Sequence, residues 1–160
     1  MTHLIPYLLD MARAMIFVDG ENLAIRYGSL LKQRNVEPRA HVTSIPNTVA
    51  WSPRLNGPTP GAGIIRRYYY TSVPGDNQAL AQAEQQIKAA GIEAPRVFRK
   101  DKTKGSKRVD ISLATDMLLH ASRKHYDIAV LVAGDEDYVP LVRAVQGEGR
   151  VCTSGFCLTG

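Results

Sequence analysis

The chain has 160 residues, of which 44% are hydrophobic and 22% are charged, a size and composition that fit one globular domain and exclude wholesale disorder. Twenty basic residues against fifteen acidic ones give a net charge of +5, which by itself favours polyanionic partners only weakly. Two cysteines exclude a disulfide framework and no apolar run approaches the roughly 18 residues of a membrane span, so we expect a cytoplasmic protein with no membrane contact.

Five short apolar runs predict the strands of the domain. In chain order they are 14–18, 64–70, 94–98, 128–132 and a run that begins at Arg150. Segments with helical spacing lie between them, at about 22–33, 77–90, 109–124 and 138–147. Strands that alternate with helices and are apolar throughout indicate βαβ units. We therefore expect an α/β fold with a parallel sheet covered on both faces.

Three stretches fall outside this alternation, within what we interpret as a single domain over 1–160. Residues 35–62 contain five prolines, which predicts a long insertion loop with Trp51 packed on the body of the domain. A disordered segment is the alternative. Residues 1–12 are expected to form a leader. A doubly wound domain usually has a helix after its fifth strand, so the C-terminal helix is expected to be truncated.

Acidic residues follow two of the predicted strands. Asp19 comes directly after the first, with Asn22 three residues later, and Asp135 and Asp137 follow the fourth. In an open parallel sheet, ligands bind beyond the carboxyl ends of the strands, so these side chains converge if the two strands are neighbours. The structural alternatives are a turn at Asp19 and a helix N-cap at Asp137, with Pro140 in the first turn.

A fourth candidate acid lies on a predicted helix. A helical wheel places Asp110 near the middle of a broad apolar arc. The arc comprises Val109, Ile111, Leu113, Ala114, Met117, Leu118 and Ala121. A carboxylate that points inward from this arc needs a cation or another partner. The alternative is an ordinary ion pair with Lys107 or Arg108. Asp116 lies at the margin of the arc, where it faces either the site or solvent.

The clustering of these acids indicates a metal site. Carboxylates forced together repel one another and raise each other's pKa, and a hard divalent cation removes that conflict. Mg²⁺ and Mn²⁺ prefer such oxygen ligands. The four histidines and two cysteines have no zinc-site spacing, and neither a P-loop nor a dinucleotide-binding glycine motif is present. Glu21 and Glu136 are interpreted as surface or supporting acids.

A basic segment directly precedes Asp110. It contains Arg99, Lys100, Lys102, Lys104, Lys107 and Arg108. Such a segment binds nucleic-acid backbones without reading their sequence, and its position beside the acids favours that role over a merely solvated loop. Tyr68, Tyr69 and Tyr70, together with Arg66 and Arg67, are candidates for stacking on bases, although strand alternation directs at least one of the rings into the core.

Three blocks of the sequence resemble a known pattern. They are 17–23 (FVDGENL), 107–116 (KRVDISLATD) and 132–141 (VAGDEDYVPL). Together they are similar to the signature blocks of NYN domains, PIN-like ribonucleases that include the LabA-like bacterial group. The resemblance implies a Rossmann-like three-layer α/β/α sandwich and an acidic pocket that binds Mg²⁺ or Mn²⁺. It implies that Asp19, Asp110, Asp135 and Asp137 hold the metal, with Asp116 as an extra ligand and Asn22 in a supporting or water-positioning role.

The expected function is therefore metal-dependent hydrolysis of RNA, either single-stranded or structured. One alternative is a phosphatase of the haloacid-dehalogenase type, in which Asp19 is the nucleophile. Another is a noncatalytic RNA-binding scaffold. The sequence leaves open the choice of RNA, the number of metal ions and the oligomeric state, with a homo-oligomer as one alternative.

Overall fold

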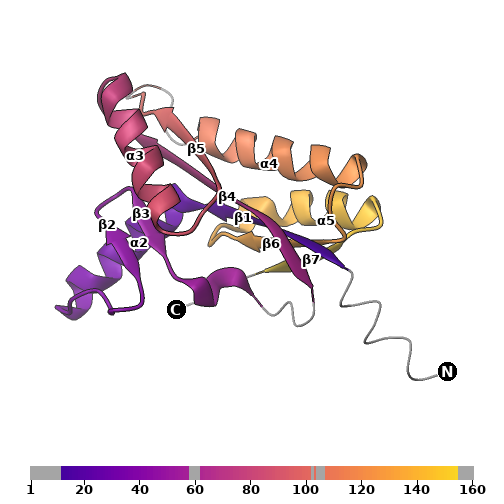
Figure 1. Ribbon diagram of the computed structural model, residues 1–160, viewed down its shortest axis with the longest axis horizontal. Helices are drawn as coiled ribbons and strands as arrows, with labels where there is room; N and C mark the ends of the chain where they lie inside the picture. Colours follow the sequence, from indigo (N-terminus) through magenta and orange to yellow (C-terminus); the bar gives the residue numbers. More distant parts are fainter. Residues whose placement is uncertain (1–11, 58–61, 102, 104–106, 155–160) are drawn as a thin grey trace.

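Five parallel strands form the centre of the protein (Figure 1). The computed structural model describes residues 12–57, 62–101, 103 and 107–154. The strands lie in the order β5–β4–β1–β6–β7. They are β1 (Arg13–Asp19), β4 (Gly63–Val73), β5 (Ala94–Arg99), β6 (Ile128–Val132) and β7 (Val151–Ser154). The five predicted strands and the parallel sheet are confirmed.

Helices cover both faces of this sheet. They are α2 (Gly20–Arg34), α3 (Asn77–Ala89), α4 (Lys107–Ser122) and α5 (Val139–Gly147). Side chains of α4 and α5 belong to one core cluster, which contains Phe17 of β1. Ile87 of α3 and Leu23 of α2 pack in a second cluster, which contains Val18. The fold is therefore the expected three-layer α/β/α sandwich.

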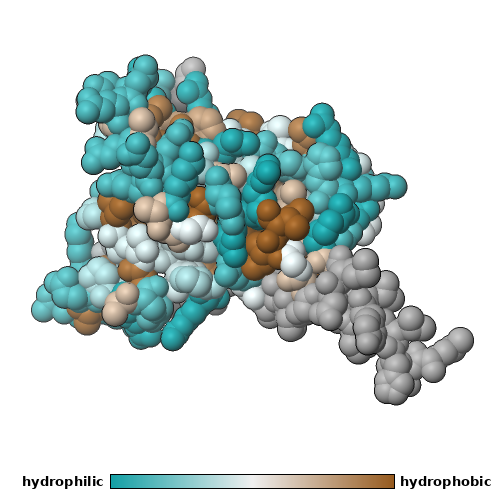
Figure 2. Space-filling model, in the orientation of Figure 1, coloured by the Kyte–Doolittle hydropathy of each residue, from teal (hydrophilic) through white to brown (hydrophobic). Residues whose placement is uncertain are grey.

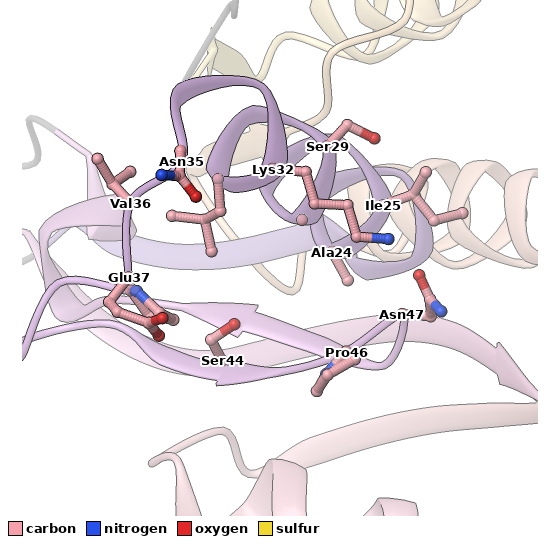
Figure 3. A pocket seen from close by; sticks show the side chains of 13 residues that line it. Ala24, Ile25, Ser29, Lys32, Asn35, Val36, Glu37, Ser44, Pro46 and Asn47 are labelled. Carbon is pink, nitrogen blue, oxygen red and sulfur yellow. The ribbon is translucent and has the colours of Figure 1, made fainter.

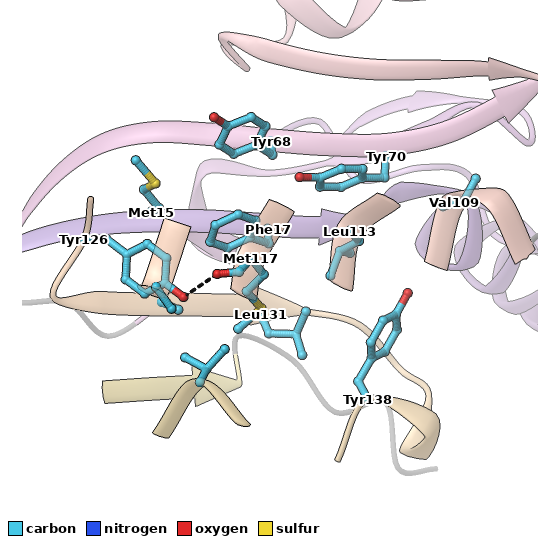
Figure 4. Packing of buried hydrophobic residues seen from close by; sticks show 13 residues of the cluster. Met15, Phe17, Tyr68, Tyr70, Val109, Leu113, Met117, Tyr126, Leu131 and Tyr138 are labelled. Atoms are coloured by element: carbon cyan, nitrogen blue, oxygen red, sulfur yellow. Dashed lines mark hydrogen bonds between the residues drawn. The ribbon is translucent and has the colours of Figure 1, made fainter. Parts of the chain in front are cut away.

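Alternation along β4 divides its aromatic side chains between the two cores. Tyr68 and Tyr70 lie in the cluster under α4, and Tyr69 lies in the opposite cluster (Figure 4). All three are at most 1% exposed. The prediction that these rings stack on bases is therefore wrong, because an interior strand of a covered sheet buries the side chains on both of its faces.

Part of the apolar arc that the helical wheel predicted for α4 is exposed in the structure. Val109, Leu113, Met117 and Ala121 are buried. Ile111 is 65% exposed and Leu118 is 38% exposed, so the buried face of α4 is narrower than the predicted arc. The reason is that α4 packs on the sheet through one stripe of residues four apart, which leaves the flanks of a broad apolar arc uncovered.

The proline-rich stretch 35–62 is more ordered than a loop. It contains a hairpin of β2 (Thr43–Ile45) and β3 (Val49–Trp51), followed by the 3₁₀ turn η1 (Pro53–Asn56). Trp51 is 2% exposed within the α2–α3 side core, as predicted. Figure 3 shows the hollow of about 530 Å³ between α2 and this hairpin. Residues 58–61 of the stretch and 1–11 of the expected leader lie outside the described residues.

The order of the strands fixes where a ligand site belongs. After β1, the chain adds β4 and β5 on one side, and later adds β6 and β7 on the other. The order in which the chain adds strands therefore reverses between β1 and β6, and ligands of such sheets bind beyond the strand ends at this point. Over the described residues, no helix is long and apolar enough to span a membrane. The face drawn in Figure 2 is hydrophilic over α3.

Candidate active site

Asp19 is the last residue of β1 and is nearly buried, at 3% exposure. Its Oδ1 accepts a hydrogen bond from the backbone N–H of Asn22 at 3.2 Å, so the carboxylate also caps α2. The pKa of Asp19 is raised to about 6, chiefly by burial and to a smaller extent by the charges of Asp110 and Glu21, while the hydrogen bonds of the carboxylate act in the opposite direction. The site thus holds this carboxylate in an environment that disfavours its ionised form.

Tyr138 joins Asp19 to the acid on α4. Its hydroxyl lies 3.0 Å from Asp19 Oδ2 and 3.2 Å from Asp110 Oδ1. A phenol has one proton, so it donates to only one of these oxygens at a time. Figure 4 shows the ring directed from the segment after β6 toward α4. Carboxylates from β1 and α4 are therefore within reach of the same small group.

Asp110 lies in the first turn of α4 and is partly buried. Burial raises its pKa, and the charges of Asp135, Glu21 and Asp137 add to that shift, whereas the hydrogen bond from Tyr138 lowers it. Among the described ion pairs none joins Asp110 to Lys107 or Arg108, which was the alternative interpretation of this residue. Its neighbours are instead other acids.

Asp135 and Asp137 are exposed on the segment after β6. Asp135 caps the 3₁₀ turn η2 (Glu136–Tyr138) by accepting from the N–H of Asp137 at 3.0 Å. Asp137 is not the N-cap of α5, because that position belongs to Tyr138, which makes no side-chain cap. Pro140 lies in the first turn, as expected. Both acids line, with Asp110 and Tyr138, a hollow of about 510 Å³.

Glu21 is the site residue that the sequence interpretation undervalued. It is 4% exposed, and its Oε1 lies 3.3 Å from Nζ of Lys100. Its Oε2 and the Oδ1 of Asn22 are buried without a hydrogen-bond partner among the described atoms. A signal was available, because Glu21 occupies the first turn of a helix that starts directly at the end of β1. The short Asp19–Gly20–Glu21 connection leaves it no route to the surface.

Asp116 lies elsewhere on α4. It accepts a hydrogen bond from the Tyr70 hydroxyl at 2.9 Å and pairs with Arg96 at 3.6 Å. Six residues of helix separate it from Asp110, about 9 Å along the axis. The structure thus places it beside β4 and β5, not beside the Tyr138 hydroxyl.

The basic segment adjoins the acids through Lys100, which pairs with Glu21. Arg99 donates to Asn77 Oδ1 at 2.7 Å, and Arg99, Lys100 and Arg108 line an open hollow of about 450 Å³. Lys107 is exposed at the start of α4. Lys102 and Lys104 lie outside the described residues.

The profile of the NYN domain matches residues 13–157. The chain belongs to the NYN domain family. NYN domains are generally nucleases and generally act on RNA. No curated protein matches this chain.

Two solved structures match this NYN domain in the structural comparison. One is a protein of unknown function from Vibrio parahaemolyticus, with a TM-score of 0.59 and 15% sequence identity, over 91% of this chain and 81% of that one. The other is the C-terminal domain of a hydrogenase from Pyrococcus furiosus, with a TM-score of 0.43 and 8% identity, over 89% and 90% of the two chains. The first of these similarities supports the fold.

The donor set of this NYN domain fits a hard divalent cation in kind. Its acids supply oxygen ligands, and the unpartnered Oε2 of Glu21 and Oδ1 of Asn22 are further oxygens beside them. Within the part of the chain that the structure describes, no three of these side chains already form a common binding position. The hydroxyl of Tyr138 lies between Asp19 and Asp110 instead.

Proposed function

We propose that this NYN domain is a metal-dependent ribonuclease that hydrolyses RNA phosphodiester bonds. The observation that supports the proposal is that Asp19 and Asp110 both lie within hydrogen-bond distance of the Tyr138 hydroxyl. This contact lies at the strand ends where the order of the strands reverses. Two carboxylates with raised pKa values in a partly buried site are poised for a cation.

Asp19 and Asp110 would hold Mg²⁺ or Mn²⁺, with Asp135 and Asp137 from the segment after β6. Such an ion, when bound, polarises a phosphoryl oxygen and supplies a nucleophile at neutral pH. The N–H of Asn22 fixes Asp19, and the Tyr138 hydroxyl lies within hydrogen-bond distance of both carboxylates and donates to one of them at a time while no cation is bound. Arg99, Lys100 and Arg108 would bind the RNA backbone at the edge of the same site.

Cleavage of RNA in Mn²⁺ tests the proposal. We expect the wild type to cut, and Asp110→Asn to lose activity at least about a hundredfold, because a group that acts on transition-state charge is removed. Asparagine still accepts from Tyr138, so the fold is retained. Glu148→Gln is the control, since it removes an exposed acid at the far end of α5. Equal cleavage by wild type and Asp110→Asn would contradict the assignment of the site.

The same assay separates the two alternatives. A phosphatase would hydrolyse a small phosphate ester and trap phosphate on Asp19 while leaving RNA intact. A noncatalytic scaffold would bind RNA in a salt-sensitive way without cutting it and would take up no Mn²⁺ in calorimetry.

A further inference from the structure

Two arginine side chains meet at one tyrosine on the α4 side of the sheet. The guanidinium carbon of Arg66 on β4 lies 6.0 Å from the ring centroid of Tyr68, and that of Arg96 on β5 lies 5.3 Å from it. Both arginines are exposed, whereas the Tyr68 ring is buried. Two guanidinium groups at the protein surface therefore lie close to the same buried ring, and aromatic rings attract such cations.

An acid within ion-pair distance balances one of these charges, whereas Arg66 interacts with the charge of Glu93 only at longer range. Arg96 pairs with Asp116 at 3.6 Å, and that carboxylate also accepts from Tyr70. Arg66 has no carboxylate within ion-pair distance among the described residues. It donates from Nη1 to the Tyr68 hydroxyl at 3.4 Å. An exposed, weakly hydrated guanidinium beside a second one is suited to an anion that accepts several hydrogen bonds, such as a phosphate.

The directions of the hydrogen bonds made by the Tyr68 hydroxyl also favour an anion as the ligand. Because Arg66 has only donors, the Tyr68 oxygen accepts from it and directs its own proton to Nε2 of His120, 2.9 Å away. His120 then carries its proton on Nδ1 and donates to Nδ1 of His125 at 2.8 Å. This series of hydrogen bonds ends in a donor at each side, namely the Arg66 guanidinium and the exposed His125.

Arg96 lies level with the acidic site in the sheet, and Arg66 lies four residues before that level on β4, about 13 Å along the strand. Tyr70 lies next to Tyr68 (Figure 4) and stacks on it, and it pairs in register with Asp19 on β1. Lys100 directly follows β5 and is four residues from Arg96, about 13 Å of extended chain, and Lys100 pairs with Glu21. Two cationic side chains thus lie on the α4 side of the edge strand, separated by the apolar Phe98.

We propose that Arg66 and Arg96 bind a backbone phosphate of the RNA strand whose cleaved bond lies at Asp19 and Asp110. The inference rests on the proposed ribonuclease function and adds a direction to it, because the strand then runs from the acids along β5. Since the neighbouring tyrosine rings are buried, this contact reads the backbone and not the bases.

The test measures binding of a labelled oligoribonucleotide by fluorescence anisotropy, with EDTA present so that no cleavage occurs. We expect Arg66→Gln/Arg96→Gln to weaken binding about tenfold and to reduce the slope of log Kd against log salt by about 1. The control Arg39→Gln/Arg54→Gln makes the same change of charge at exposed positions beside the hairpin, and it is expected to leave both quantities nearly unchanged. Arg66→Gln alone keeps the Arg96–Asp116 pair and is expected to show part of the effect.

Two results would overturn the inference: equal weakening by both double variants, or no weakening by Arg66→Gln/Arg96→Gln when circular dichroism shows it folded. Binding of a dinucleotide must be insensitive to the arginines, because it does not reach them. If Asp110→Asn stops cleavage while Arg66→Gln/Arg96→Gln binds RNA as tightly as the wild type, this inference fails and the ribonuclease proposal stands. If the wild type never cuts RNA but the arginine variant loses RNA binding, the ribonuclease proposal fails and this surface stands.

Discussion

The hydroxyl of Tyr138 lies 3.0 Å from Oδ2 of Asp19, and this contact joins the end of the first strand to the turn after β6. The same oxygen is 3.2 Å from Oδ1 of Asp110. Tyr138 therefore occupies the space between two carboxylates that a shared cation would need. It stabilises the site in the absence of a metal, and under the proposed function it would compete with a cation bound there.

Tyr138→Phe tests this competition. We expect Mn²⁺ to bind several-fold more tightly to this variant, because no hydroxyl has to be displaced. The free energy of unfolding of the metal-free variant is expected to be lower by about 1–3 kcal/mol, because the two carboxylates lose the donor that they share. Calorimetric titration and denaturant unfolding measure the two effects. Tyr126→Phe is the matched control, since its hydroxyl donates to the Met117 carbonyl inside the core. Loss of Mn²⁺ binding in Tyr138→Phe would show that the hydroxyl supports the metal instead.

Asp19→Asn is expected to stabilise the metal-free protein above pH 6. The folded state raises the pKa of Asp19 from 3.8 to about 6, so the folded state binds the proton more tightly than the unfolded state. Its stability therefore falls as pH rises from about 4 to 6, in total by about 3 kcal/mol, and stays low above that range. Asparagine removes this loss.

The measurement is the midpoint of unfolding for the wild type and Asp19→Asn across that pH range. The gain is expected to be about 1–3 kcal/mol above pH 6 and to vanish below pH 3.8, where the wild-type carboxyl is protonated in both states. Mn²⁺ is expected to stabilise the wild type but not the variant. A variant that is less stable than the wild type at every pH would contradict the account of Asp19.

Gly20→Ala is expected to destabilise the protein by about 1–3 kcal/mol or more. A Cβ at this position would come within 2.0 Å of the Tyr69 ring, which is fully buried and cannot move aside. Gly28→Ala is the control in the same helix, because nothing lies within 4 Å of its Cβ position. Removing a helical glycine there is expected to stabilise by up to about 1 kcal/mol. Similar unfolding midpoints for both variants would refute the steric role.

The sequence was sufficient to predict the parallel sheet and the meeting of Asp19 with Asp110. Strand ends and helical faces follow from periodicity, and both acids are placed by those two rules. The sequence did not predict that Tyr138 lies between them, because Tyr138 follows an exposed turn whose direction depends on the packing of α5. Glu21 was undervalued for a related reason, since its burial depends on how tightly α2 starts after β1.

The hairpin and the arginine pair were missed because their signals are weak or non-local. Proline-rich sequence indicated a loop at 35–62, yet Trp51 and Val49 bury enough apolar surface to order two short strands. Arg66 and Arg96 are distant in the sequence and become neighbours only because β4 pairs with β5. Pattern reasoning that follows one element at a time does not detect such a pair.

The most direct test of the central claim is anomalous diffraction from a crystal soaked in Mn²⁺. The account predicts a manganese peak between Asp19 and Asp110, with the Tyr138 hydroxyl displaced from that position. A crystal saturated with Mn²⁺ that shows no peak there, or in which Tyr138 still bridges the two carboxylates, would contradict it.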